Sequence, residues 1–322
     1  MELITNKKKK AIYSDFEKAD FKFIYVCILI PVLQFAIFWG YVNFDSILLA
    51  FQTPKGDFTF QNFKDVWTAF TVEDIYYGFN LFEMLGRSLT LFAIANLIVF
   101  PISLCATYVL FRKVWGHYVF RVIYMLPGVI GAVAWVATIK QVADYNGIVV
   151  TLLENLGVEF DFMVNRQGLF ASETTAFPTI IAVMFFQGIC GGSAVLTGAF
   201  ARIPGEIYEV GKLDGIGFWT EFFKIAVPCI WPVISMQFTF SLCGIFIAEG
   251  NVFLYSNGTG EPGMATIGYY LTYLVYKISL AGGNELPYGY PAALGMVITA
   301  VTVPIALGGK WLLEKVTEPV EY

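Results

Sequence analysis

Six long apolar runs, separated by shorter polar segments, dominate the pattern of the chain. A helix that crosses a bilayer needs about 20 mostly apolar residues, so each run is long enough to span a membrane. Pro101 interrupts the second run, and Pro127 with Gly128 falls inside the third. The pattern predicts an all-α integral membrane protein with six transmembrane helices, over residues 23–44, 82–111, 118–140, 177–199, 225–248 and 290–312.

The polar segments divide the chain around these helices. Residues 45–81 are more polar and rich in aromatic side chains, which predicts an external segment with a short surface helix. The first apolar run is too long for the core of a cleaved signal peptide, so it is interpreted as an uncleaved first helix. The predicted units are an N-terminal segment 1–22, a first helix 23–44, the external segment 45–81, a core of five helices 82–315 and a tail 316–322.

Composition agrees with a membrane protein, because 57% of the residues are hydrophobic and only 14% are charged. Most of the 20 Lys and Arg residues lie in alternate segments between helices, starting with Lys7 to Lys10. By the positive-inside rule, both termini and the loop 203–224 are expected in the cytoplasm. The lysine run is interpreted as a topology signal that contacts lipid headgroups, and no nucleic-acid partner is expected.

Metal and disulfide chemistry find no support in the sequence. The five Cys residues are scattered without a CxxC pair, and His117 is the only histidine. One histidine cannot build a metal site alone, and scattered cysteines within apolar runs do not form a disulfide framework. We therefore expect neither a metal nor another cofactor on this chain.

The loop 203–224 carries local signals for a short helix and a sharp turn. Pro204 suits the first helical turn, where its missing N–H would have no partner. Glu206 and Glu209 follow, where carboxylates favour the positive end of a helix. Gly215 can adopt the left-handed conformation that ends a helix. These residues predict a helix over about 204–214, followed by a second helix that begins near 217 and is kinked at its prolines.

This stretch resembles the EAA motif, a cytoplasmic loop in the permease subunits of binding-protein-dependent ABC importers. That motif reads Glu-Ala-Ala, three residues, Gly, nine residues, Ile, one residue and Leu-Pro, and here Glu209, Gly215, Ile225 and Pro228 match it. The departures are Val210 and Gly211 for the two alanines, and Val227 for the leucine. The residues before the motif, beginning Ile203-Pro204, and the Asp214-Gly215 pair are similar to the maltose/oligosaccharide branch.

The resemblance implies the type I ABC importer permease fold, with a cytoplasmic coupling helix, in the bacterial cytoplasmic membrane. It implies a second similar permease, two copies of a cytoplasmic ATPase, an extracytoplasmic binding protein and a carbohydrate substrate. ATP and Mg would bind the ATPase, because Gly205–Leu213 lacks the spacing and the Ser or Thr of a phosphate-binding loop. The residues implied in coupling are Glu206, Glu209, Gly211, Asp214, Gly215, Ile225 and Pro228.

Three amides near the middle of predicted helices are candidates for a substrate path. Asn96, Gln187 and Gln237 would lie at mid-depth, where polar groups are costly and therefore informative. Amides suit sugar hydroxyls, and the ring of Trp135 suits the face of a sugar. The alternative is that these amides only bond neighbouring helices.

The sequence leaves two other functions open. The same fold could carry another solute, such as a polyamine or phosphate. An integral-membrane enzyme is a different class, but the sequence contains no His pair, metal cluster or nucleophile motif for it. We therefore expect a transport subunit that is not itself an enzyme.

Overall fold

The structure is a computed structural model, and it describes residues 24–25, 27–53, 55–72, 79–112, 114, 116–157, 168–191, 193–247, 251–256, 262–280 and 288–316. Regular structure in these residues is helical, apart from one isolated antiparallel bridge between Gln52 and Phe58. The predicted segment 1–22 and nearly all of the predicted tail lie outside the described residues.

The first apolar helix is longer at its C-terminal end than the sequence predicts. It runs over Cys27–Ala50 and includes the π-helical turn η1 (Phe35–Tyr41) and α2 (Val42–Ala50). The predicted end at residue 44 is therefore wrong. The polar Asp45 and Ser46 interrupt the apolar pattern of the sequence, but the helix continues through them. The Ser46 hydroxyl donates to the Val42 carbonyl at 2.9 Å, which satisfies it inside the helix.

The expected short surface helix is α3 (Gln61–Thr71). Its Asn62 is buried, and the side-chain amide donates to the carbonyls of Ala50 at 2.9 Å and Gln52 at 3.0 Å. Asn62 therefore ties α3 to the end of the first helix. A Cβ on Gly289 would lie 2.4 Å from the Asn62 amide nitrogen, so α18 (Gly289–Val316) can approach only because glycine stands there.

The second predicted span is one continuous helix over Leu81–Phe111. It consists of α4 (Leu81–Ile94), the π-helical turn η2 (Ala95–Val99) and α5 (Phe100–Phe111). The Asn80 side chain caps it by accepting from the N–H groups of Phe82 and Glu83. Pro101 has no N–H to donate, and the wider turn η2 precedes it without breaking the helix.

The third and fifth predicted spans are bent pairs of helices. α6 (His117–Val129) meets α7 (Ala132–Val142) at 101°, just after Pro127. The fifth consists of α13 (Phe218–Glu221), η3 (Phe222–Ala226), α14 (Val227–Cys229) and α15 (Trp231–Cys243), bent by 70° between Pro228 and Pro232. The prolines thus mark both bends, as their missing hydrogen bonds predict.

The remaining described elements complete the fold. The fourth span comprises α10 (Glu173–Gly191) and α11 (Ser193–Phe200), and α18 forms the sixth. Shorter elements are α8 (Ile148–Asn155), α12 (Gly205–Leu213), α16 (Val252–Tyr255), η4 (Pro262–Met264) and α17 (Ile267–Leu280). Among the described residues, four helices are long and apolar enough to cross a membrane, and counting each bent pair as one span raises the number to six.

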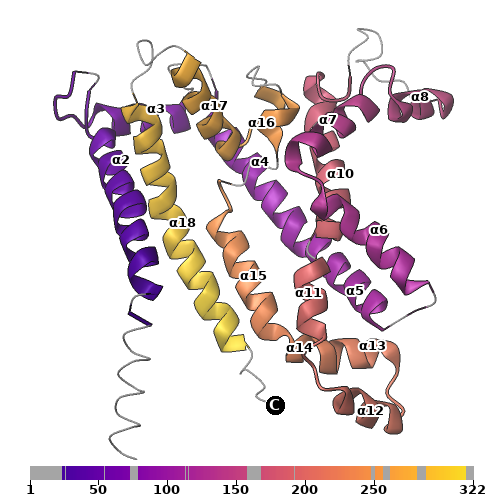
Figure 1. Ribbon diagram of the computed structural model, residues 1–322. Coiled ribbons are helices and arrows are strands. Elements are labelled where there is room, and N and C mark those ends of the chain that lie inside the picture. The colour runs from indigo at the N-terminus through magenta and orange to yellow at the C-terminus, as the bar shows by residue number, and fades with distance from the viewer. Residues whose placement is uncertain are drawn as a thin grey trace, which may run out of the picture.

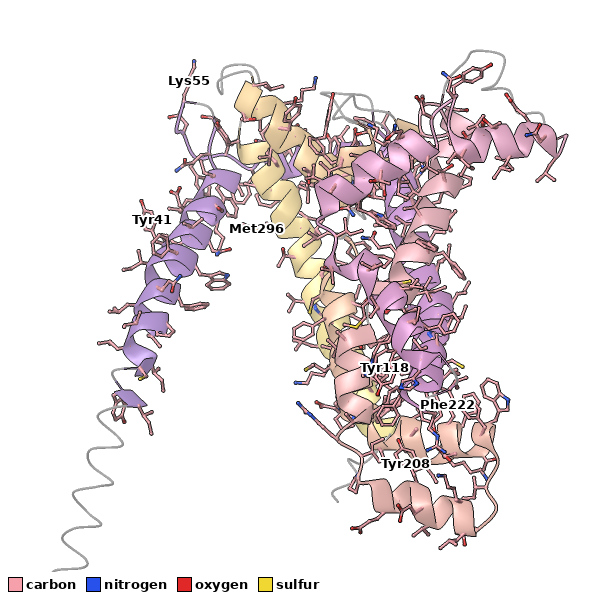
Figure 2. All side chains as sticks on the ribbon, turned by 45° about the vertical axis from the view of Figure 1, so that its right-hand side comes forward. Tyr41, Lys55, Tyr118, Tyr208, Phe222 and Met296 are labelled. Atoms are coloured by element: carbon pink, nitrogen blue, oxygen red, sulfur yellow. The ribbon has the colours of Figure 1, made fainter. Side chains whose placement is uncertain are left out.

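The short elements gather at the two ends of the spanning helices (Figure 1). Figure 1 shows α12 and α13 at one end, and α3, α16, α17 and α8 at the other. Tyr208 and Phe222 mark the first end and Lys55 the second (Figure 2). We call these the α12 end and the α17 end.

Each end has its own buried hydrophobic core. The larger core lies toward the α17 end and includes the fully buried Tyr269, Tyr270 and Tyr290. The smaller core surrounds Tyr108 and Phe200 near the α12 end. The smaller core includes Tyr208 of α12 and Phe222 of η3, so it holds the elements of the α12 end together.

Candidate functional site

The turn after α12 has a geometry that only glycine adopts without strain. Gly215 has φ +67°, its N–H donates to the Lys212 carbonyl at 3.1 Å, and the Ile216 N–H donates to the Gly211 carbonyl at 3.0 Å. This pair of bonds is the Schellman motif, which satisfies the last carbonyls of a helix. The predicted sharp turn at Gly215 is confirmed, and the helix covers 205–213, with Pro204 as the residue just before it.

Ile225 packs closely against the last turn of α12. A Cβ on the buried Gly211 would lie 3.4 Å from the Ile225 Cδ1 atom and 3.8 Å from the Ile216 Cδ1 atom. The space above Gly211 is therefore taken by this chain's own isoleucines. Pro228, in α14 after Ile225, lies near the 70° bend that leads into α15.

The opposite face of α12 is exposed and mixes acidic with apolar side chains. Glu206 and Glu209 are exposed, as is Asp214 at the end of the helix. Val210 and Leu213 lie on the same helix with 57% and 88% of their surface accessible. This face of α12 therefore offers both apolar and charged groups for contact with a neighbouring molecule.

A buried ion pair joins the α12 end to a spanning helix, and sequence reasoning missed it. Glu221 in α13 is 3% exposed, and its carboxylate accepts from the Tyr108 hydroxyl and from Arg112 Nη2, the latter at 3.0 Å. The Arg112 guanidinium also lies 5.2 Å from the centre of the Tyr208 ring of α12. The available signal was an acid inside the aromatic run Phe-Trp-Thr-Glu-Phe-Phe, 218–223. A carboxylate buried in such a run needs a cationic partner.

Each of the three candidate amides lies at the middle of a helix, and for Gln237 that helix is only the second part of the bent fifth span. Asn96 is at the middle of the helix 81–111, Gln187 at the middle of 174–200 and Gln237 at the middle of α15. The structure then separates them, because Asn96 and Gln237 line one pocket and Gln187 does not.

That pocket, which we call the amide pocket, has a volume of about 250 Å³ between η2, α5, α10 and α15. The Asn96 amide donates to the Phe92 carbonyl at 2.9 Å and to the Ser241 hydroxyl at 2.8 Å. The Gln237 side-chain oxygen is buried and accepts no hydrogen bond from the described residues. Gly188 brings α10 close and Ser103 adds a further hydroxyl, so the pocket offers polar but uncharged groups.

Trp135 lies outside the amide pocket. It is 6% exposed in α7, and its ring stacks on that of Phe186 with centroids 5.9 Å apart. α7 packs against α16, where burial raises the pKa of the Tyr255 hydroxyl to about 12. The side chain that would present an aromatic face to a sugar is thus already covered on one face by Phe186.

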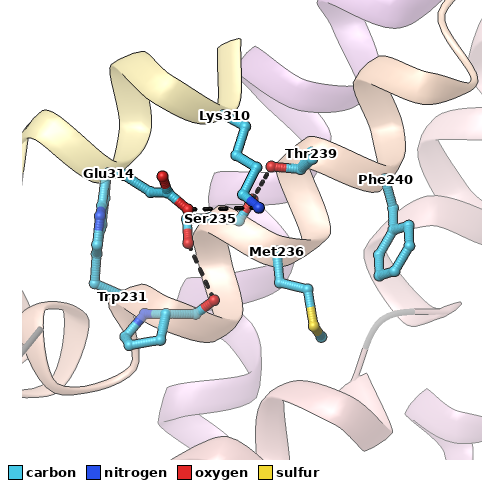
Figure 3. Close-up of a pocket in the computed structure, with 8 residues that line it drawn as sticks. Trp231, Ser235, Met236, Thr239, Phe240, Lys310 and Glu314 are labelled. Carbon is cyan, nitrogen blue, oxygen red and sulfur yellow. Dashed lines mark hydrogen bonds and ion pairs between the residues drawn. The ribbon is translucent and has the colours of Figure 1, made fainter. Parts of the chain in front are cut away.

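A larger groove lies between α15 and α18, with a volume of about 530 Å³ (Figure 3). Its wall includes Trp231, Met236 and an exposed ion pair in which Lys310 Nζ lies 3.7 Å from Glu314 Oε1. No residue predicted for the substrate path lines it. Within the described ranges, His, Cys, Asp and Glu side chains nowhere gather in a set able to hold a metal ion.

No protein-family profile matches the chain, but individual relatives do. The diacetylchitobiose uptake system permease protein of Streptomyces coelicolor is 26% identical over 300 residues, covering 87% of this chain and 76% of that one. The multiple sugar-binding transport system permease protein of Streptococcus mutans is 24% identical over 277 residues, covering 81% and 90%.

Solved structures share the fold. A bacterial ABC transporter involved in the import of the acidic polysaccharide alginate matches with a TM-score of 0.72 and 21% identity, covering 95% of this chain and 99% of that chain. The same kind of transporter, in complex with an alginate pentasaccharide-bound periplasmic protein, matches with a TM-score of 0.71.

These matches define the class of protein. The chain is a multi-pass membrane protein with the fold of an ABC importer permease. More narrowly, its sequence relatives include permeases of sugar ABC transporters.

Proposed function

We propose that the chain is the membrane-spanning permease subunit of an ATP-driven ABC importer, and that its solute is a neutral carbohydrate, most like an oligosaccharide. The observation that carries the solute class is the amide pocket. Its Asn96, Gln237 and Ser241 groups can exchange hydrogen bonds with hydroxyls, and Gln237 has an acceptor left open for a donor.

The uncharged wall of the amide pocket favours a carbohydrate over the alternative solutes. A polyamine would need carboxylates and a phosphate would need basic groups or a helix N-terminus, because a charge is costly at mid-depth unless it is paired. No Asp, Glu, Lys or Arg lines the pocket. A neutral polyhydroxyl solute therefore suits it better than either ion.

We propose that α12 is the helix through which a cytoplasmic ATPase drives this permease. Its exposed face carries Glu206, Glu209 and Asp214, and its turn is fixed by Gly215 and by the contact of Gly211 with Ile225. A helix fixed in this way would move as a rigid body when the ATPase displaces it. The α12 end would face the cytoplasm, and ATP would be hydrolysed by the ATPase and not by this chain.

The proposed assembly contains a second similar permease, two ATPase copies and an extracytoplasmic binding protein. Its support is the relatedness to sugar permeases and the solved importer in complex with its periplasmic protein. Alternating access would follow from the ATPases closing, which moves α12 and turns the spanning helices around the amide pocket.

The test is transport by the complete complex in proteoliposomes. The chain is purified with its ATPase, partner permease and binding protein, and uptake is measured for labelled neutral oligosaccharides, spermidine and phosphate. We expect ATP-dependent uptake of at least one oligosaccharide and of neither ion. Uptake of spermidine or phosphate without any sugar would replace the proposed solute while leaving the class of transporter intact.

A further inference from the structure

Glu221 is the only charged residue among the described residues whose whole surface is almost fully buried. Its side chain is 4% exposed, whereas the Arg112 side chain that pairs with it is 24% exposed. Burying a carboxylate costs several kcal/mol, and hydrogen bonds to both oxygens are needed to offset that cost. Glu221 has both, since Tyr108 donates to one oxygen and Arg112 to the other.

The groups around Glu221 come from three separate elements. Tyr108 and Arg112 belong to the end of the spanning helix α5, Glu221 to α13, and Tyr208 to α12. Arg112 touches two of these elements at once, because it pairs with Glu221 and lies over the ring of Tyr208. Figure 2 shows Tyr208 at the α12 end, below Phe222, which follows Glu221 in the chain.

The contacts of this cluster differ in kind from the rest of the smaller core. Apolar contacts such as those of Tyr108 with Phe200 and Phe222 are non-directional, so the packed elements can slide over one another. The bonds to Glu221 are directional, and separating them would leave an uncompensated charge in an apolar surrounding. α5 and α13 are therefore expected to move as one body.

We propose that Tyr108, Arg112 and Glu221 form a rigid linkage that carries displacement of α12 into the spanning helix α5. The proposal rests on the proposed function, and within it these three are positioning residues. Movement of α12 reaches Arg112 through the ring of Tyr208 and then passes from Arg112 to Glu221. The hydrogen bond from Tyr108 to Glu221 ties the same movement to α5 one helical turn before Arg112. The motif residues Gly211 and Ile225 supply a separate, apolar contact to the same helix.

The test compares the number of ATP molecules hydrolysed per solute molecule transported. Tyr108→Phe, Glu221→Gln, Arg112→Gln and the double variant Arg112→Gln/Glu221→Gln are each purified in the complete complex and placed in proteoliposomes. ATPase copurification, ATP hydrolysis and uptake are measured on the same preparations. We expect the complexes to retain the ATPase, while the ATP-to-solute ratio rises about tenfold, a size typical of coupling between sites.

Two variants serve as matched controls. Tyr118→Phe removes a hydroxyl from a tyrosine that is 75% exposed, and Glu314→Gln breaks the exposed ion pair with Lys310. Neither should change the ratio. The double variant should raise the ratio no further than either single variant, because both changes break one linkage and are therefore not additive.

A falling yield of complex with an unchanged ATP-to-solute ratio would overturn the proposal, since the cluster would then only stabilise the fold. If Glu221→Gln does not assemble, Tyr108→Phe decides, because it keeps the ring and the charge pair. Failure of the carbohydrate assignment is a distinct result: the wild-type complex would transport another solute, and the same ratio would be measured with that solute.

Discussion

At the scale of single residues, the two glycines of the turn after α12 differ in backbone conformation. Gly215 has φ +67° and Gly217 has φ −72°, and neither would bring an added Cβ within 4 Å of another group. Gly215→Ala should strain the turn by about 1–2 kcal/mol, because an L-residue is disfavoured at positive φ. Gly217→Ala carries no such strain.

We expect Gly215→Ala to lower solute-stimulated ATP hydrolysis or ATPase copurification, and Gly217→Ala to leave both unchanged. Both variants should insert into the membrane in normal amounts, because the spans have their own packing. Equal behaviour of the two alanine variants in the copurification and hydrolysis assays would mean that the left-handed turn is not what makes α12 an effective lever.

Of the two amides in the pocket, Gln237 is the better one to substitute. Its side-chain oxygen accepts no hydrogen bond from the described residues, whereas Asn96 already bonds to Ser241. Gln237→Leu keeps the bulk of the side chain but removes the hydrogen bond that a solute hydroxyl would make, worth about 1–2 kcal/mol. We expect the KM for oligosaccharide uptake to rise about tenfold. Gln187→Leu is the control, because Gln187 lies outside the amide pocket, at the middle of the helix 174–200.

Residue-scale prediction from the sequence succeeded where the rule was local. A glycine after an acidic helix end predicts its own turn, and the midpoint of an apolar run can be counted. The face on which Gln187 or Gln237 lies depends on packing between helices, which the run does not encode. Arg112 and Glu221 are 109 residues apart in the chain, so their pairing could not be read from spacing.

At the scale of elements, the two hydrogen bonds of the Asn62 side chain should decide whether α3 stays packed on the first helix. Asn62→Ala leaves the carbonyls of Ala50 and Gln52 without their side-chain donor, which should cost about 1–3 kcal/mol. A lower apparent melting temperature of the purified chain is the expected result. Gln61→Ala is the neighbouring control, since the Gln61 side chain is exposed and bonds only to Asp65 of its own helix. Equal melting temperatures for the two variants would contradict the idea that the Asn62 hydrogen bonds hold α3 on the first helix.

Element boundaries were predictable where a proline or a cap marks them. The bend between Pro228 and Pro232 falls where the sequence predicts a kink. The bend after Pro127 was not predicted, and Pro101 breaks no helix, so a proline alone does not decide between a bend and a continuous span. The first helix was predicted too short because two polar residues were given the weight of a boundary. In a helix their side chains can bond to the preceding turn, as Ser46 does, and the apolar pattern then resumes for another turn.

At the scale of the whole molecule, the prediction concerns which end faces the cytoplasm. Leu213→Cys at the α12 end and Lys55→Cys at the α17 end are made singly in a chain whose five native Cys are replaced. Both positions are exposed, so a membrane-impermeant thiol reagent can reach either one from its own side. We expect intact cells to label position 55 at once and position 213 only after permeabilisation. The reverse order would invert the proposed topology.

The separation of the hydrophobic interior into two cores has a consequence for how such a chain can diverge. Because the core near α17 and the core around Tyr108 share no residues, a substitution that loosens one leaves the packing of the other in place. The end proposed to contact the ATPase can then keep its shape while the end proposed to contact the binding protein changes. In relatives that keep the same ATPase but transport a different solute, substitutions would accumulate around Tyr269 and Tyr290. The residues around Phe200 would change less.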